Sequence, residues 1–488
     1  MTEAAGASEG AGASPGVVAA VDLGATSGRV ILGYVTPHAI TLRHIARFPN
    51  TPVRTADGLH WNILELYRNV LAGLGVAARD EPGLSSIGID SWAVDYALMR
   101  GGRMLGTPYH YRDGRTASAV ERTHSLVPRD ELSAASGLQH LPFNTAFQFV
   151  ADQAAGMLDL ADTALLIPDL IAFWLTGVAV AERTNASTTG LLDVRTREWN
   201  DQLIARLGLA RGILPPLVDA GNTIGPVSGQ VRNDLGIDAT RPLDVIAVGS
   251  HDTASAVVAV PATTEHFAYI SCGTWGLVGV ELDSPVLTPD AAAANFTNEG
   301  GVDGRIRFLH NVMGLWLLSE SVRHWERDGP AVDLHALLDA AAAVTTPVTV
   351  FDADDPRLLP PGDMPSRISE LCRERGGRVP ASPAEFVRSI IDSLAAAFAG
   401  TVAAASTLAN KRVDIIHIVG GGSQNALLCQ AIADRSGLPV LAGPVEATAI
   451  GNVLVQARAR GFIMGDLEAL RALVTRSMPP RTYRPRIR

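Results

Sequence analysis

The sequence predicts an α/β fold with two domains that enclose one ligand between them. Strand-like and helix-like stretches alternate along the first half, as they do in α/β proteins. Two turns rich in glycine and hydroxyl side chains lie between apolar strands, one within residues 17–34 and one within residues 269–280. A chain of 488 residues is long enough for two large domains. We therefore expect a duplicated domain that grips one polyphosphate between its halves.

The first half carries the periodicities of α/β units. Apolar residues recur at helical spacing through residues 60–78, which predicts an amphipathic helix. Residues 86–90 form an apolar strand-like run, and residues 93–98 alternate as a further strand would before a Gly-Gly turn. A buried helix is expected at 167–175 and an apolar strand at 242–248.

The second half begins near residue 261, where proline and threonine residues precede the second turn. We therefore divide the chain into an N-terminal domain, 17–260, and a C-terminal domain, 261–488. The elements expected in the C-terminal domain are helices at 314–327, 386–398, 425–437 and 447–461 and strands at 413–419 and 439–441. Residues 1–16 lack a basic start and an apolar stretch, so they are predicted to be a disordered tail and not a signal peptide.

Composition argues against several classes of protein. The net charge is −10 and the isoelectric point about 5.6, whereas a nucleic-acid binder would present a basic face. Residues 164–181 and 394–409 come closest to a membrane span, but neither reaches about 18 strongly apolar residues, so both are predicted to be buried helices. Three scattered cysteines predict neither a disulfide framework nor a zinc site, and they fit a reducing cytoplasm.

The first turn has the groups that bind phosphate without a Walker loop. Gly24 and Gly28 let backbone N–H groups face an anion, and Thr26 and Ser27 add hydroxyl donors. The only lysine of the chain, Lys411, does not follow a glycine-rich loop, which excludes the P-loop pattern.

Two charged side chains border this turn. Asp22 ends the apolar strand before it, where a carboxylate would hold Mg²⁺ near the phosphates or would simply cap a tight hairpin. Arg29 would reach a phosphate or pair with a surface acid.

Another candidate carboxylate begins a helix within residues 250–257. It follows the predicted strand 242–248 at its carboxyl end, where ligands bind in open α/β sheets. Asp252 is a candidate base toward a substrate hydroxyl, the alternative being that Ser250 or Asp252 is the helix N-cap. A carboxylate near a helix N-terminus should stay ionised, as a base must. His251 would be a hydrogen-bonded structural histidine or the partner of a sugar hydroxyl.

Three further stretches are candidates for ligand contact. Residues 419–425 run from a strand through three glycines into a helix, which would admit adenosine closely or make only a tight connection. Residues 90–96 and 110–113 mix aromatic rings with hydrogen-bonding groups, as sugar sites do. No Cys/His spacing indicates a transition metal, and no Gly-x-Ser-x-Gly elbow joins a strand to a helix.

Taken in order, these motifs resemble those of the FGGY carbohydrate kinases of the actin/hexokinase superfamily. The matching stretches are VDLGATSGRV, GIDSWAVDYAL, HYRDGRT, FNTAFQF, LIPDLIAFWLTG, ERTNAS, GSHDTASAV, SCGTWGL, NEGGVDGRIRFLHNVMGLWLL and IVGGGSQN. They run from Val21 to Asn425, which is most of the chain, and GSHDTASAV and the NEGG block are the most specific. Within the family they look most like the kinases that act on L-rhamnulose.

The resemblance implies two ribonuclease-H-like α/β domains with a central cleft, ATP mainly on the second and the sugar mainly on the first. It implies that Asp252 is the catalytic base and that Asp22 helps to place Mg²⁺. The residues expected to bind the nucleotide are Ala25, Thr26, Ser27, Gly28, Arg29, Thr274, Gly421 and Gly422. Those expected to contact the sugar are Ala93, His251, Asp252, Thr253 and Asn311.

Two positions depart from the family's pattern. Ala93 stands where the family usually has glycine beside the sugar, and one extra methyl group there would reshape the pocket. Ser319 stands where related kinases often have a glutamine near the nucleotide.

The reaction implied is transfer of the γ-phosphate of Mg-ATP to the C1 hydroxyl of L-rhamnulose, a step of rhamnose breakdown. The protein is expected to be a cytoplasmic monomer or homodimer that binds neither nucleic acid nor a membrane. Three alternatives stay open. They are a kinase for another ketose such as L-fuculose or D-xylulose, a non-catalytic sugar or nucleotide sensor, and an actin-like assembly protein. A sensor should lack a base such as Asp252 and usually carries an interaction module such as a DNA-binding helix pair. The Trp and His content around residues 90–113 and 251 favours a small polar ligand over an assembly protein.

Overall fold

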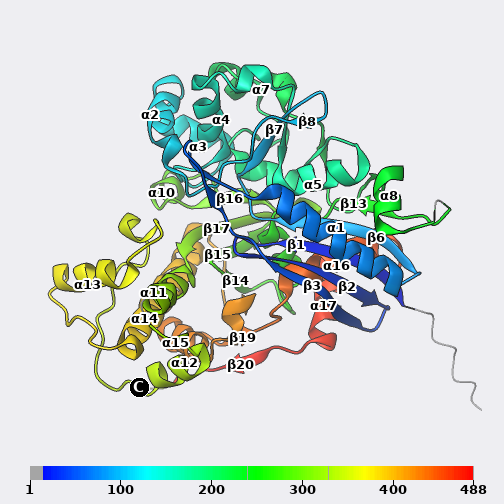
Figure 1. Ribbon diagram of the computed structural model, residues 1–488. Helices are drawn as coiled ribbons and strands as arrows, with labels where there is room; N and C mark the ends of the chain where they lie inside the picture. Colours follow the sequence, from blue (N-terminus) through cyan, green and yellow to red (C-terminus); the bar gives the residue numbers. More distant parts are fainter. Residues whose placement is uncertain (1–14, 239, 328, 487–488) are drawn as a thin grey trace, which may run out of the picture.

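The computed structural model describes residues 15–238, 240–327 and 329–486 (Figure 1). Most of the tail predicted at residues 1–16 lies outside the described residues, and Gly16 is already the first residue of a strand. Within the described residues the architecture is two mixed β-sheets with helices on their faces, which confirms the predicted α/β class.

The first sheet has six strands in the order β12-β13-β6-β1-β2-β3. Strands β1, β2 and β3 form an antiparallel meander, whereas β6 and β13 run parallel to β1. The apolar run before the first turn becomes β1, which is buried on both faces. The bounds are β1 Gly16–Leu23, β2 Ser27–Val35, β3 Ile40–Pro49, β6 Leu84–Ser91, β12 Thr223–Pro226 and β13 Asp244–Ile246.

The second sheet repeats this pattern with one strand more. Its order is β16-β17-β15-β14-β18-β19-β20, in which β14, β15 and β17 are antiparallel and β18 and β19 run parallel to β14. The second turn thus lies between β14 and β15 as the first lies between β1 and β2, which confirms the predicted duplication. The bounds are β14 Phe267–Cys272, β15 Trp275–Leu282, β16 Thr297–Gly300, β17 Ile306–Met313, β18 Ile415–Val419, β19 Val440–Ala442 and β20 Arg481–Tyr483.

A helical layer extends the first half beyond its sheet, at the top of Figure 1. Its helices are α2 Ala117–Leu126, α3 Arg129–Ser136, α4 Thr145–Ala154, α6 Arg183–Ala186 and α7 Asp201–Arg206. Against the first sheet lie α1 Ile63–Asp80, α5 Ile167–Thr176 and α9 Asp252–Val258, and α8 Gly229–Leu235 packs against α1. The short strands are β4 Val53–Arg54, β5 Leu59–His60, β7 Tyr96–Arg100, β8 Arg103–Met104, β9 Thr163–Leu166, β10 Ala181–Glu182 and β11 Leu217–Val218.

One sequence expectation in this half is wrong. The strand expected over residues 93–98 begins only at Tyr96, because Val94 has a φ of 68° and breaks the extended backbone. Ala93 therefore lies in a turn and not in a strand, and the backbone N–H of Asp95 donates to its carbonyl at 2.9 Å.

The second half contains the longest helix, α14, Pro383–Leu408. It is the one helix of the described residues long and apolar enough to cross a membrane by length and composition. Its apolar face is instead buried in the core of the second domain through Val387, Ile391, Leu394 and Phe398, as expected of a core helix. The other helices of this half are α10 Pro289–Ala293, α11 Trp316–Arg327, α12 Leu334–Ala342, α13 Met364–Glu374, α15 Ala426–Ser436, α16 Ala447–Ala459 and α17 Leu467–Ser477.

The end of the chain returns to the first sheet. Helix α16 packs against α9, β1 and β6, so it covers a face of the N-terminal sheet (Figure 1). A Cβ on Gly451 would lie 1.8 Å from the carbonyl oxygen of Ser255, which shows how closely α16 approaches α9. Asn452 and Gln456 extend this contact, and Asn452 Nδ2 donates to buried Asp90 at 2.6 Å. Residues far beyond the predicted domain boundary therefore help to hold the helix that begins at Asp252.

Candidate active site

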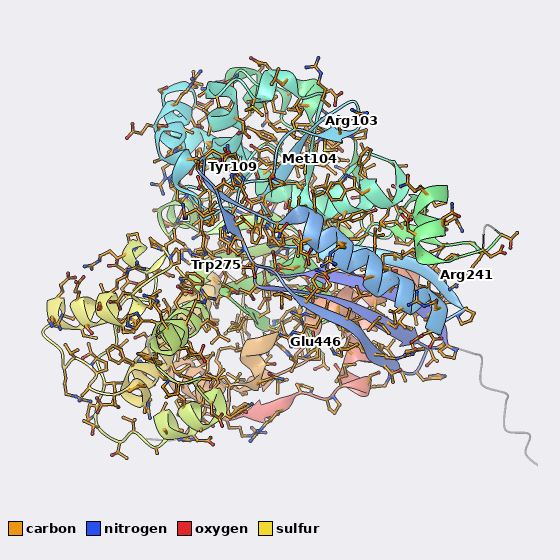
Figure 2. All side chains as sticks on the ribbon, viewed as in Figure 1. Arg103, Met104, Tyr109, Arg241, Trp275 and Glu446 are labelled. Carbon is orange, nitrogen blue, oxygen red and sulfur yellow. The ribbon has the colours of Figure 1, made fainter. Side chains whose placement is uncertain are left out.

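A cavity of about 410 Å³ lies between the two sheets and is lined by residues of both halves. Trp275 and Glu446, labelled near the centre of the molecule in Figure 2, are part of its wall. Most of the predicted site residues line it together. They are Asp22, Ala25, Thr26, Ser27, Arg29, Ala93, His251, Asp252, Thr253, Thr274, Asn311 and Gly421. The remaining two, Gly28 and Gly422, are not among its lining residues.

Packing explains why Gly28 and Gly422 are glycines. A Cβ on Gly28 would lie 2.2 Å from the Phe48 ring, and a Cβ on Gly422 would lie 2.3 Å from Cys272 Sγ. Neither space admits a side chain, because contacts this short do not occur between heavy atoms. Nucleotide contact by these two residues stays a prediction.

The two turns face the cavity and are fixed from outside it. In the first, Gly24 N donates to Ser27 O at 3.0 Å, and Asn50 holds it through Nδ2 to Gly24 O at 2.9 Å and N to Thr26 O at 3.0 Å. In the second, Gly273 N donates to Trp275 O at 2.8 Å. Turns held this firmly can present N–H groups to a phosphate without reorganising.

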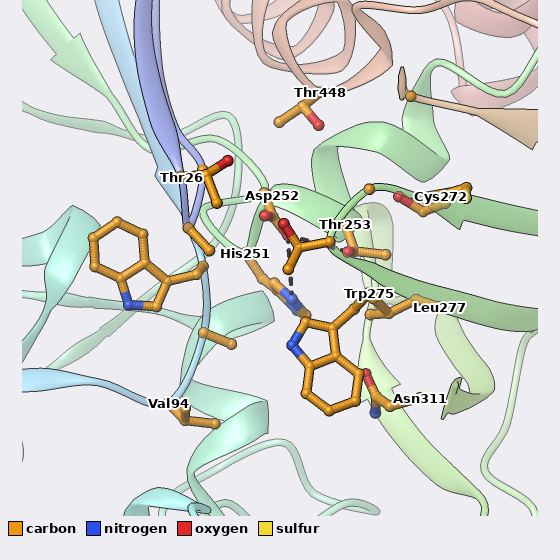
Figure 3. Close-up of a pocket in the computed structure, with 18 of the residues that line it drawn as sticks. Thr26, Val94, His251, Asp252, Thr253, Cys272, Trp275, Leu277, Asn311 and Thr448 are labelled. Carbon is orange, nitrogen blue, oxygen red and sulfur yellow. Dashed lines mark hydrogen bonds and ion pairs between the residues drawn. The ribbon is translucent and has the colours of Figure 1, made fainter. Parts of the chain in front are cut away.

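Asp252 is the first residue of α9, and its side chain is 30% exposed toward the cavity. The N-cap is His251, whose side chain makes no capping hydrogen bond, and the hydroxyl of Ser250 donates to Glu182 at 3.0 Å. The capping alternative for Asp252 and Ser250 is therefore wrong. Figure 3 shows the Asp252 carboxylate with the Thr253 hydroxyl, which donates to it at 3.1 Å.

Asp22 is buried at the base of the first turn. Burial raises its pKa to about 6, against the attraction of Arg29 and with the repulsion of Asp252 and Glu446. Arg29 Nη1 lies 3.6 Å from Asp22 Oδ2, which has no hydrogen-bond partner within the described part of the chain. A buried carboxylate oxygen without a donor is costly unless a cation meets it, so this side chain fits a bound Mg²⁺.

Arg29 pairs with Glu446 from the second half of the chain. The surface-acid alternative for Arg29 is only partly right, because Glu446 is itself part of the cavity wall. The guanidinium therefore stays beside the cavity and links the two halves at the phosphate turn.

Asp95 holds the aromatic residues Trp61, Trp92 and Tyr111 in place, and the last two line the cavity. Sequence reasoning missed this role. Asp95 Oδ2 accepts from Trp61 Nε1 at 2.6 Å, from Trp92 Nε1 at 3.2 Å and from Tyr111 N at 3.0 Å, while Oδ1 accepts from Gln148 at 2.9 Å. Burial raises its pKa to about 6, although these donors oppose the shift. The sequence signal was the Asp inside the aromatic stretch 90–96, but its partners come from elements that only folding brings together.

Gln139 is a second residue that sequence reasoning missed. Its Oε1 accepts from Asn311 N at 2.9 Å and from Asn311 Nδ2 at 2.8 Å, so it joins the first half to β17 of the second. No pattern around Gln139 in the sequence indicates this contact. Ser319, the other departure from the family's pattern, is exposed on α11.

These features define a class of protein: a two-domain α/β phosphotransferase that can hold a nucleotide and a polar substrate in one cleft. The chain matches the family profile described as "FGGY family of carbohydrate kinases, N-terminal domain" over residues 17–259, and that of the C-terminal domain over residues 268–460. The chain therefore belongs to the FGGY family of carbohydrate kinases.

Curated relatives are similar along nearly the whole chain. A rhamnulokinase of Bacteroides thetaiotaomicron is 40% identical over 469 residues, covering 96% of this chain and 95% of that protein. A rhamnulokinase of Pectobacterium carotovorum subsp. carotovorum is 43% identical over 476 residues, covering 96% and 93%.

Solved structures show the same fold at lower identity. A ligand-bound xylulose kinase from Lactobacillus acidophilus has a TM-score of 0.77 and 17% identity, covering 96% of this chain and 94% of that one. The Plasmodium falciparum glycerol kinase with ADP has a TM-score of 0.73 and 15% identity over the same shares. Both likenesses confirm the predicted two-domain fold.

Proposed function

We propose that this carbohydrate kinase transfers the γ-phosphate of Mg-ATP to the C1 hydroxyl of L-rhamnulose, giving L-rhamnulose 1-phosphate and ADP. Support comes from the family and from relatives at 40–43% identity that carry the name rhamnulokinase. The observation that carries the proposal is the Asp252 carboxylate. It lies in the cavity that both phosphate-type turns line, and it does not cap its helix.

In this mechanism Asp252 is the general base. As the C1 oxygen bonds to the γ-phosphorus and the bond to the β–γ bridging oxygen breaks, the hydroxyl proton passes to the Asp252 carboxylate. Proton transfer of this kind suits a weak base held within reach of the hydroxyl, because the transition state is loose. The hydroxyl of Thr253 keeps one carboxylate oxygen oriented.

The two turns would bind the phosphates. Backbone N–H groups of Ala25 and Thr26, the hydroxyl of Thr274 and the guanidinium of Arg29 are the donors at this end of the cavity. Asp22 would hold Mg²⁺, which when bound supplies positive charge to the phosphate oxygens. Magnesium is commonly held by one or two carboxylates together with phosphate oxygens, and Asp22 provides such a carboxylate.

The sugar would lie against aromatic side chains that both domains contribute to the cavity. Trp92 and Trp275 offer apolar faces, and His251 and Asn311 offer hydrogen-bonding groups, as a polyhydroxylated substrate requires. Ala93 lines the same cavity, and its methyl group, where the family usually has glycine, is the reason to test a second candidate, a kinase for another ketose such as L-fuculose or D-xylulose.

The test is ADP release from Mg-ATP with L-rhamnulose, L-fuculose, D-xylulose and L-ribulose, and with glycerol as a control. A preference for L-rhamnulose of tenfold or more in kcat/KM, about 1.4 kcal/mol, supports the proposal. A preference for another ketose moves the specificity and makes Ala93 the first residue to exchange. Failure of all four ketoses rejects the kinase activity on ketoses.

We also infer that the protein works in the cytoplasm, as a monomer or a homodimer. The inference rests on its use of ATP and on the buried free thiols of Cys272, Cys372 and Cys429, which fit a reducing compartment. Sedimentation at several concentrations with Mg-ATP would measure the oligomeric state.

A further inference from the structure

The most specific block of the sequence contributes more to the site than Asn311. Glu299 on β16 and Arg307 on β17 face each other directly across the two strands, and Glu299 Oε2 lies 3.1 Å from Arg307 Nη1. The Arg307 side chain has no exposed surface, and its Nε donates to Gly300 O at 2.9 Å. A guanidinium buried to this degree requires an ionised partner close by.

Glu299 is that ionised partner. Burial by itself would raise its pKa, but the positive charge of Arg307 opposes burial, and the pKa lies below its usual value. Glu299 also lines the cavity, whereas Arg307 lies behind it. The pair is therefore a fixed, charge-balanced unit on the second-domain sheet.

Arg307 of this pair holds the imidazole of His251, and Glu299 lies close to it. Arg307 Nη2 lies 3.1 Å from His251 Nδ1, and Glu299 Oε2 lies 3.3 Å from the same nitrogen. The other ring nitrogen, Nε2, lies 3.4 Å from Asp252 Oδ1. A continuous line of contacts thus runs from β16 and β17 through His251 to the proposed base.

Of the two contacts at Nδ1, only the one with Arg307 is a hydrogen bond, since Glu299 Oε2 has no hydrogen-bond partner among the described residues, so Arg307 decides which ring nitrogen carries the proton. A guanidinium has donors and no acceptor, so its approach to Nδ1 is a hydrogen bond only if Nδ1 accepts. The proton of the neutral ring then sits on Nε2, where it faces Asp252.

We propose that Glu299 and Arg307 are positioning residues for phosphoryl transfer, which hold His251 in the Nε2–H tautomer and thereby orient Asp252 toward the sugar hydroxyl. The proposal rests on the proposed kinase function. Because the pair belongs to the second-domain sheet and His251 precedes α9 of the first half, the base is oriented only when both halves meet at this contact. Misplacing a reacting group by about 1 Å costs roughly 10²-fold in rate.

The first experiment compares two matched variants, Glu299→Gln and Glu281→Gln. Glu281 lies on β15, is equally buried, and is paired with Arg471 through two hydrogen bonds of 2.8 Å, but it does not line the cavity. Both variants break a buried Glu–Arg pair whose glutamate lies in the second-domain sheet. Glu299→Gln should lower kcat roughly 10²-fold while KM for Mg-ATP stays within about twofold. Glu281→Gln should leave both parameters near wild type.

Glu299→Asp provides the rescue. It keeps the charge that Arg307 requires and shortens the side chain by one methylene group, so it should recover about tenfold of the lost kcat. Where Glu299→Gln does not fold, Glu299→Asp and the wild-type measurement below still test the proposal.

The second experiment reads the tautomer without turnover. ¹⁵N-histidine spectra of the wild-type protein, with His251→Gln to assign the resonance, should show a protonated Nε2 and an unprotonated Nδ1. In Glu299→Gln the two tautomers should mix. A wild-type ring protonated at Nδ1, or at both nitrogens, overturns the proposal, as do equal kcat values for Glu299→Gln and Glu281→Gln.

The two proposals fail in different ways. Kinetics are measured with whichever ketose the wild-type enzyme phosphorylates, so a substrate other than L-rhamnulose rejects the substrate assignment and leaves the comparison of variants intact. If the wild-type enzyme is active on L-rhamnulose and Glu299→Gln has the same kcat, only the positioning role is rejected.

Discussion

Replacing Asp252 with asparagine tests the mechanism at the atom that carries it. The exchange keeps the size of the side chain and its contact with the Thr253 hydroxyl, but it removes the capacity to accept a proton. A positioned general base contributes roughly 10²–10⁴-fold to rate, which is about 2.7–5.5 kcal/mol of transition-state stabilisation. We expect kcat to fall by that factor.

Stability should change far less than activity. Asp252 makes no N-cap hydrogen bond, and a charge in the first turn of a helix contributes about 0.3–1 kcal/mol. Its loss is offset because Asp252 is one of the charges that raise the pKa of buried Asp22. The free energy of unfolding should therefore stay within about 1 kcal/mol of wild type.

The assay measures ADP release, with ATP affinity by calorimetry and urea unfolding on the same preparations. Asp201→Asn is the matched control, because Asp201 is also the first residue of a helix, is 76% exposed and lies outside the cavity. A folded Asp252→Asn protein that binds ATP and keeps kcat within tenfold of wild type refutes the role of Asp252 as base.

Three further predictions follow from buried contacts. Since the pKa of Asp22 rises from 3.8 to about 6, the folded protein binds the extra proton in that window, and stability falls as pH rises through it by up to about 3 kcal/mol. Asp22→Asn should raise the free energy of unfolding at pH 7 and weaken the dependence of activity on Mg²⁺. If urea unfolding shows that the free energy of unfolding of Asp22→Asn changes between pH 4 and pH 7 by as much as that of the wild type, this prediction is contradicted. Gly451→Ala should lower stability by about 1–3 kcal/mol or more and also lower kcat, because the new Cβ meets Ser255 O in α9. The control is Gly400→Ala, in an open part of α14, which should raise the free energy of unfolding by up to about 1 kcal/mol and leave kcat unchanged. Equal urea midpoints for the two variants would refute the close contact of α16 with Ser255. Ala93→Gly should change the kcat/KM ratio between ketoses by roughly 10–200-fold, and an unchanged ratio means that residue 93 does not contact the sugar.

Many helices and strands could be predicted because local sequence patterns and capping residues indicate them. The strand expected at 413–419 is β18, and the helix expected at 425–437 is α15, with Asn425 as its N-cap and Gly437 as its C-cap. The strand at residues 93–98 was mispredicted because alternation is a pattern of side chains, whereas the positive φ of Val94 is imposed by tertiary contacts. One such contact is the hydrogen bond from Thr145 Oγ1 to Val94 O at 2.7 Å.

The sequence by itself determined the chemistry of the site. The glycines and hydroxyls that bind phosphate, and the carboxylates of Asp22 and Asp252, belong to short stretches of the sequence. The chemical groups of these stretches can be identified without knowing the tertiary structure.

Only the tertiary structure decided how those groups are held. The contact of Asp90 with Asn452 joins residues that are 362 positions apart in the chain. In the line of contacts from Arg307 through His251 to Asp252, the first contact joins residues that are 56 positions apart. Such pairs leave no periodic signal in one sequence, because burial of a polar group demands a partner without specifying where in the chain it comes from.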